Sequence, residues 1–343
     1  MSPARRKSAT GSTTDRAVIA WLLEKDQPGV RYRTLTELLH RPASDPEVRA
    51  ARKNIPLRGW AAEILARRDP AGWWAHEKSL YRPKYLSTNW NLLALSELGA
   101  TRAIPAVRAS CELWMDRSPL KGGGVGGFSN GNGHHCYTGN MARALIRFGY
   151  GDDPRLRKAL DWLVRTAHPR GGWTCWSFRD GPSPGRTLDS WEGLSAFAAY
   201  PRSKWTPAMK DCVERGAEFY LDRELHRQGA RYAPWYRFHW PVHYYYDLLV
   251  GLDFMTALGY SGDKRLGYSI SLLKEKRRQD GRWNLDANRP EDSPALIAWR
   301  KQHPRSQDLT PFVLENPGHP SKMITLAAMK VLTRLGESKL GTD

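Results

Sequence analysis

The sequence is poor in cysteine and has no long apolar run. Only 4 cysteines occur among the 343 residues, which argues against a secreted protein stapled by disulfides. No stretch approaches the roughly 20 apolar residues of a transmembrane helix. Residues 1–13 are rich in Ser, Thr, Lys and Arg and lack the apolar core of a secretory signal. The sequence therefore predicts a cytoplasmic location, a disordered basic tail over residues 1–13, and thiols that stay free or bind metal.

Signatures of specific nucleic-acid recognition are also missing. The chain has no helix-turn-helix, zinc-finger or RNA-recognition motif, although it carries 53 Lys and Arg against 35 Asp and Glu, a net charge of +18. We therefore expect no specific nucleic-acid partner. A basic surface of this kind suits peripheral contact with an anionic membrane or a diphosphate, and the alternative is a solvated surface without a partner.

A loop with glycine followed by an aromatic residue recurs along the chain. It is found at residues 71–74, 126–128, 171–173 and 280–283, each time ahead of an apolar helical segment. Such a period is typical of stacked two-helix units that bury their apolar faces against neighbours. Helical periodicity predicts roughly twelve helices in six pairs. In each pair one helix is charged on one face and the other is apolar nearly all round, so we expect an outer and an inner ring.

With these Gly-aromatic repeats, the chain resembles the terpenoid cyclase and protein prenyltransferase superfamily over residues 14–336. That resemblance implies an all-α fold, an α/α toroid of about six helix pairs in a single domain over 14–336, with a short tail at 337–343. It also implies that an isoprenoid or similarly apolar molecule binds in the central cavity. Protein prenyltransferases require a partner subunit, and one sequence does not show whether this chain has one.

Imidazole and thiol groups gather where the inner helices are expected to begin. His134-His135-Cys136-Tyr137 resembles the His-x-Cys-Tyr segment of prenyltransferase β subunits, which implies a zinc-ligand role for His134. Cys175 begins a Cys-Trp-Ser-Phe run similar to the one that holds the zinc-binding cysteine of those enzymes. Here the two segments occur in the opposite order, and the position of the family's Asp ligand is Trp173.

Chemistry alone permits a tetrahedral zinc site built from these residues. The candidate ligands are Cys136 and Cys175 with one or two of His134, His135 and His243, and water would complete an open site. The alternative is a pair of buried free thiols beside a hydrogen-bonded histidine.

The Asp-x-Asp-Asp acid motif of the cyclase branch is absent from the sequence. Catalytic protonation would then need another acid, and the candidates near inner-helix starts are Asp189, Glu192 and Asp247. Each has the alternative role of capping a helix or pairing with a basic side chain. Aromatic rings that could line the cavity and bind substrate are Trp90, Tyr137, Trp176, Trp191, Trp240, Tyr244 and Tyr245, with core packing as the alternative.

Three functions follow from these patterns. The first is a transferase or cyclase that binds an isoprenoid substrate and uses zinc. The second is a zinc toroid resembling lanthionine cyclases, which acts on a peptide. The third is a noncatalytic toroid that binds a lipid or a peptide.

Overall fold

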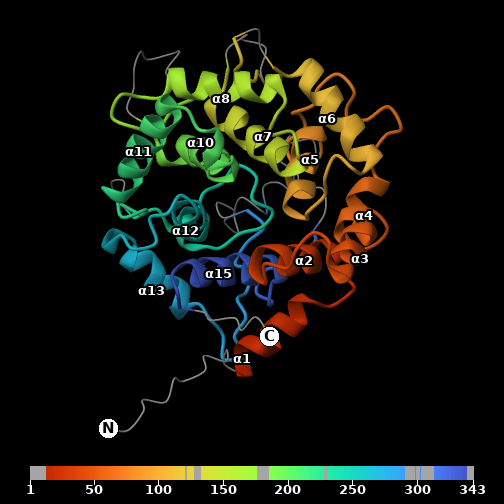
Figure 1. Cartoon of the computed structure of the whole chain (residues 1–343), viewed down its shortest axis with the longest axis vertical. Helices are drawn as coiled ribbons and strands as arrows, with labels where there is room; N and C mark the ends of the chain where they lie inside the picture. The colour runs from red at the N-terminus through yellow and green to blue at the C-terminus, as the bar shows by residue number, and fades with distance from the viewer. Residues whose placement is uncertain are drawn as a thin grey trace.

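The protein is an α/α toroid, with helices arranged in an inner and an outer ring (Figure 1). The computed structural model describes residues 13–119, 122–126, 133–175, 185–227, 231–289 and 313–337, together with residues 298 and 302. Within these ranges the regular secondary structure is helical, and β-pairing is limited to isolated bridges such as that of Asn284 with Pro320. None of the described helices combines the length and the apolarity needed to cross a membrane.

The inner ring surrounds the middle of the molecule. Its helices are α2 (Pro28–Arg33) continued by the π-helical η1 (Thr34–Leu38), α5 (Thr88–Glu97), α7 (His135–Phe148), α10 (Thr187–Ala199), α12 (Leu248–Ala257) and α15 (Lys322–Arg334). Neighbours in chain order pack together from α5 to α15, and α15 returns against α2 and η1 (Figure 1). The ring closes where Arg33 Nη1 donates to the carbonyl of Glu97 at the end of α5, 2.7 Å away.

The outer helices cover the inner ring. They are α1 (Thr13–Leu22), α3 (Pro46–Asn54), α4 (Gly59–Ala66), α6 (Pro105–Arg117), α8 (Pro154–Thr166), α11 (Pro207–Leu221) and α13 (Gly267–Glu275). Short 3₁₀ turns lie between them as η2 (Arg202–Lys204), η3 (Ala233–Tyr236) and η4 (Lys264–Leu266).

Burial separates the two rings as their sequences predict. Every residue of α5 is buried, whereas α8 buries only Leu156, Ala159, Leu160 and Leu163, which lie on one face. A helix that is apolar all round needs neighbours on every side, and a one-sided helix needs only one. Asp153 caps α8 by accepting a hydrogen bond from the N–H of Arg155.

In three of the repeats a tryptophan ties the outer helix to the inner helix that follows it. Indole Nε1 of Trp173 donates to the carbonyl ten residues earlier, at the end of α8, over 2.9 Å. Its backbone N–H donates to the hydroxyl of Ser190 in the first turn of α10. Trp74 and Trp283 make the same two contacts, with Thr88 and Thr325 as the hydroxyl acceptors. The repeat is therefore a hydrogen-bonded corner, and its glycine supplies the positive φ that the turn needs, 87° at Gly171.

Helices α7 and α10 approach each other most closely at Gly139. A Cβ atom at this position would lie 2.5 Å from the backbone nitrogen of Gly193, so only glycine fits. This close approach brings the first turns of the two helices together. The N-terminal and C-terminal tails, apart from Thr13 and Glu337, lie outside the described residues.

Candidate metal centre

Two cysteines and an aspartate converge at the start of α7 and α10. Cys136 lies in the first turn of α7, and Cys175 follows the Trp173 corner. Their sulfur atoms are 3.1 Å apart, and the backbone N–H of Cys136 also donates to the sulfur of Cys175 over 3.4 Å. Asp189, in the first turn of α10, accepts a hydrogen bond from the N–H of Cys175. One ligand atom from each of the three residues falls within 4.8 Å of the others.

Two histidines flank this thiol pair. The Nδ1–H of His135 donates to the carbonyl of Thr174 over 3.1 Å, which leaves the lone pair of Nε2 available in the neutral ring. That Nε2 is buried and has no hydrogen-bond partner of good geometry. The ring stacks on Trp162 with centroids 4.7 Å apart, so its orientation is fixed. His134 is also buried and interacts with the sulfur of Cys175.

The electrostatics of the pair favour one thiolate. The hydrogen bond shared with Cys136, followed by the interactions with His134 and His135, holds the pKa of Cys175 well below its usual range although burial opposes this. The same shared hydrogen bond and burial raise the pKa of Cys136. Burial, and then the nearby charge of Cys175, raise the pKa of Asp189 to about 7. By contrast, burial raises the pKa of Cys111 and that of Cys212, so those thiols stay protonated.

The donors fit a zinc ion. Zinc prefers thiolate, imidazole and carboxylate ligands, and all three kinds meet here. The Thr174 carbonyl that holds His135 is the kind of outer hydrogen bond that orients a metal-binding imidazole. The sequence predicted Cys136, Cys175, His134 and His135 as ligands, and the structure brings them to one place. It adds Asp189, which was predicted as a catalytic acid.

Glu192 lies one helical turn beyond Asp189. Its side chain is fully buried, and neither carboxylate oxygen has a hydrogen-bond partner. Burial raises its pKa well above the usual range, because a charged carboxylate without partners is unfavourable in the interior. The predicted acid is thus a neutral carboxylic acid held inside the ring.

Two other predicted residues lie away from the thiols. The ring of His243 packs between Tyr85 and Trp90, at centroid distances of 5.3 and 5.6 Å, and burial lowers its pKa to about 3. It is not among the donors that converge in the described part of the chain. Asp247 caps α12 by accepting from Val250 N–H and pairs with His239. The sequence predicted His243 as a ligand because it, too, precedes an inner helix, but its ring packs against Tyr85 and Trp90 instead.

The predicted aromatic residues surround the site unevenly. The ring centroids of Tyr137 and Tyr81 are 4.8 Å apart. Burial is the main cause that raises the pKa of Tyr81 and of Tyr244, and the charges of the two cysteines raise both further. Indole Nε1 of Trp191 donates to the carbonyl of Tyr244. The remaining ones are placed elsewhere: Trp90 against Tyr81 and Tyr85, Tyr245 bonded through its hydroxyl to Tyr85, and Trp240 packed on Trp60. Trp176 lies outside the described residues.

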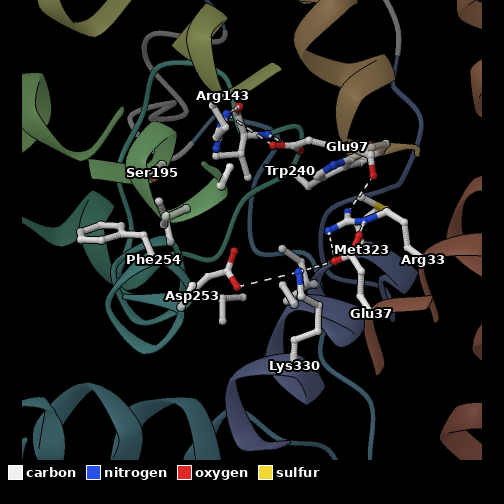
Figure 2. Close-up of a pocket in the computed structure, with 18 of the residues that line it drawn as sticks. Arg33, Glu37, Glu97, Arg143, Ser195, Trp240, Asp253, Phe254, Met323 and Lys330 are labelled. Atoms are coloured by element: carbon white, nitrogen blue, oxygen red, sulfur yellow. Dashed lines mark hydrogen bonds and ion pairs between the residues drawn. The ribbon is translucent and has the colours of Figure 1, made fainter. Parts of the chain in front are cut away.

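A cavity of about 300 Å³ lies at the middle of the ring, further along the inner helices (Figure 2). Its apolar wall includes Leu249, Phe254, Met323 and Ile324. Its other walls carry ionic side chains, which Figure 2 shows converging from α2, η1, α5, α7, α12 and α15. The sequence predicted an apolar cavity and missed this charge, because the ionic residues are scattered singly over helices that are otherwise apolar.

Comparison with known proteins gives structural likeness only. No family model and no curated protein sequence matches the chain. A protein from Actinoplanes is similar in structure, with 16% identity, 94% of this chain and 99% of that chain covered, and a TM-score of 0.46. The type II terpene cyclase MstE from Scytonema is similar at 15% identity, with 80% of this chain and 95% of that chain covered and a TM-score of 0.32. A variant of that cyclase in complex with its substrate geranylgeranyl dihydroxybenzoate has 15% identity, 80% and 94% covered, and a TM-score of 0.31.

Proposed function

We propose that this toroid is a zinc-dependent enzyme that acts on an isoprenoid or similarly apolar substrate. The observation that carries the proposal is the convergence of Cys136, Cys175 and Asp189, whose ligand atoms lie within 4.8 Å of one another in a buried site. Three protein ligands leave a fourth position for water or substrate, as catalytic zinc sites do. A bound zinc ion would supply a Lewis acid and a nucleophile at neutral pH.

The chain's own residues provide the rest of the chemistry. Asp189 is held against the N–H of Cys175, and this contact fixes the carboxylate beside both sulfurs. Glu192 keeps its proton in the buried interior, so it is placed to donate one to an apolar substrate. The rings of Tyr81 and Tyr244 lie near the thiols and could stabilise a developing positive charge.

A noncatalytic role is the second candidate, and His135 favours it. If the free Nε2 of His135 joined the other three donors, zinc would be closed by four protein ligands, which is typical of a structural site. The two candidates differ in what His135→Ala does. An open site retains zinc and activity without this imidazole, whereas a closed site loses most of its metal.

Metal analysis of the purified protein tests the proposal. We expect about one zinc per chain, lost in Cys136→Ala and Cys175→Ala and strongly reduced in Asp189→Asn. Cys111→Ala is the matched control, because this thiol is buried in α6 away from the site. Incubation with geranylgeranyl dihydroxybenzoate and native mass spectrometry then test the substrate class. Wild-type protein without stoichiometric zinc, or zinc that survives removal of both cysteines, would exclude the proposed centre.

A further inference from the structure

A buried aspartate–histidine pair lies at the central cavity. Nδ1 of His239 is 2.5 Å from Oδ2 of Asp247, and both side chains are at most 1% exposed. The same carboxylate accepts from the backbone N–H of His239 and, through its other oxygen, from Val250 N–H. With Asp247 as an acceptor only, the imidazole must carry its proton on Nδ1, so the neutral ring presents a lone pair at Nε2.

The outer nitrogen of this imidazole has no partner. Nε2 of His239 is buried and makes no hydrogen bond, while the residue contributes to the cavity wall. Buried polar atoms are nearly always satisfied, so an exception in a cavity wall marks a place where a ligand group or an ordered water binds. A neutral imidazole with a fixed Nδ1–H accepts a hydrogen bond at Nε2, so the group it awaits is an O–H or N–H donor.

The charges around the cavity favour an anion. Its wall contains five cationic side chains, Arg33, Arg143, Arg147, Lys330 and Arg334, and four carboxylates, Glu37, Glu97, Asp247 and Asp253. Arg33 and Lys330 pair with Glu37 (Figure 2). Arg334 pairs with Asp253. The wall therefore carries one positive charge more than its carboxylates neutralise.

Arg143 is the most deeply buried arginine of this wall. It is 4% exposed, and its nearest carboxylate oxygen, on Glu97, is 3.5 Å away. Its guanidinium donates to the neutral oxygens of Asn140 and Val242, and its Nε has no partner. Burial lowers the pKa of Arg143 to about 10, the direction expected for a cation whose lost hydration is incompletely replaced.

We infer that the central cavity binds a small hydroxy acid with an apolar body. The carboxylate pairs with Arg143, the hydroxyl donates to Nε2 of His239, and the apolar body packs on the wall that contains Leu249 and Phe254. A cavity of about 300 Å³ is at the lower end of the size of ligand pockets, which suits a molecule of roughly ten non-hydrogen atoms.

This site is separate from the thiols. Arg143 lies seven residues after Cys136 on α7, and Ser195 of the cavity wall lies six residues after Asp189 on α10. At about 1.5 Å per residue the two sites are about 10 Å apart along the same helices. Binding in the cavity therefore does not depend on whether zinc occupies the thiol site, and loss of one leaves the other testable.

Three related probes test the inference by calorimetry on the full chain. Mandelate carries the phenyl ring, the hydroxyl and the carboxylate, phenylacetate lacks the hydroxyl, and mandelamide lacks the charge. We expect wild-type protein to bind mandelate with a dissociation constant of about 1 mM and each of the other two about tenfold more weakly. Equal affinity for all three, or no heat with any of them, would overturn the inference.

Two substitutions assign the preferences to residues. Arg143→Gln should abolish the preference for mandelate over mandelamide and leave that over phenylacetate. His239→Asn keeps an N–H toward Asp247 but removes the Nε2 acceptor, so it should abolish only the preference over phenylacetate. Arg157→Gln is the control, because this arginine lies on the outer helix α8, where it pairs with Asp161, and should change neither preference. Preferences that survive both substitutions contradict the assignment; if a variant fails to fold, the wild-type ranking of the three probes still decides.

Discussion

The sulfur atoms of Cys136 and Cys175 lie 3.1 Å apart, although 39 residues separate the two cysteines along the chain. This distance is too long for a disulfide, which has an S–S bond of about 2.05 Å, and short enough for one shared hydrogen bond. Two separate elements hold the sulfurs there. Cys136 is fixed by the first turn of α7, and Cys175 is fixed by the Trp173 corner and by Asp189.

Mild oxidation should join these two cysteines. The lowered pKa of Cys175 provides a thiolate, and its neighbour is already adjacent, so diamide should form an intramolecular Cys136–Cys175 disulfide. Peptide mass spectrometry after digestion identifies the linkage. Cys111 and Cys212 should remain reduced, because burial keeps their thiols protonated. Zinc-loaded protein should resist the reaction, and equal oxidation of loaded and metal-free protein would contradict the shared site.

Removal of metal should lower the melting temperature. A ligand that binds only the folded protein stabilises it by about 2.7 kcal/mol when its free concentration is a hundred times its dissociation constant. We therefore expect a chelator to lower the melting temperature of wild-type protein and of Cys212→Ala by several degrees. Cys136→Ala should start lower and show no further change. Differential scanning fluorimetry measures this, and the idea fails if the chelator destabilises Cys136→Ala as much as wild type.

Gly139→Ala should destabilise the protein by about 1–3 kcal/mol, the usual cost of overpacking. The added methyl group would lie 2.5 Å from the backbone of Gly193, so α7 and α10 would have to separate. Gly267→Ala is the matched control, since a Cβ at this position in α13 meets no atom within 4 Å. Urea denaturation of both variants gives the comparison. Equal free energies of unfolding would mean that the two inner helices do not approach as closely as described.

Glu315 should make folding less favourable as the pH rises. It accepts from the Ser321 hydroxyl and the Lys322 N–H at the start of α15, and burial raises its pKa from 4.5 to about 7. A raised folded-state pKa means that the protonated form is favoured by folding, so this stability is complete below pH 4.5 and is lost as the pH rises through about 7.

The matched variant for this effect is Glu315→Gln, which cannot titrate. The difference in unfolding free energy between variant and wild type should shift in favour of the variant by roughly 2 kcal/mol from pH 4.5 to pH 8, after allowing for partial exposure. Urea denaturation at several pH values measures this difference. A constant difference across the range would show that Glu315 keeps an ordinary pKa in the folded protein.

Thr325→Val should destabilise the last repeat corner by about 1–3 kcal/mol. The substitution removes the hydroxyl that accepts from the N–H of Trp283, and a buried donor without a partner costs that much. Thr333→Val on the same helix is the control, because its hydroxyl only donates to the Met329 carbonyl. Denaturant midpoints followed by tryptophan fluorescence compare the two, and similar losses would argue against a special role for the corner.

The two-ring architecture follows from the sequence because it rests on local patterns. The Gly-aromatic corners and the contrast between all-round and one-sided helices are each visible within about 30 residues. Glycines 99, 149, 259 and 336, which closely follow the ends of α5, α7, α12 and α15, all have positive φ. The corner also explains why the sequence could predict Cys175 as a site residue. Cys175 follows Trp173 by two residues, so it lies at the inner ring beside α10.

The rest of the site depends on contacts that no local pattern encodes. Arg33 bonds to Glu97 and Lys330 pairs with Glu37, each on a different inner-ring helix. In the sequence, each of these residues is only a single charged residue in an apolar helix. His239 gives no sequence signal, because its partner Asp247 and the cavity are defined by the path of a non-helical loop. Asp189 was recognised as unusual, but its place beside the sulfurs required the close approach of α7 and α10.

Lys322 of α15 donates to the carbonyl of Trp21 and to the carboxylates of Glu24 and Asp26. The last inner helix is therefore bonded to the segment that contains the first helix. A backbone cut elsewhere in the ring would leave these contacts between the first and last helical segments in place. A circular permutant that opens at the exposed turn around Gly151, with its former ends joined by a flexible linker, should therefore rebuild the same ring and retain both sites.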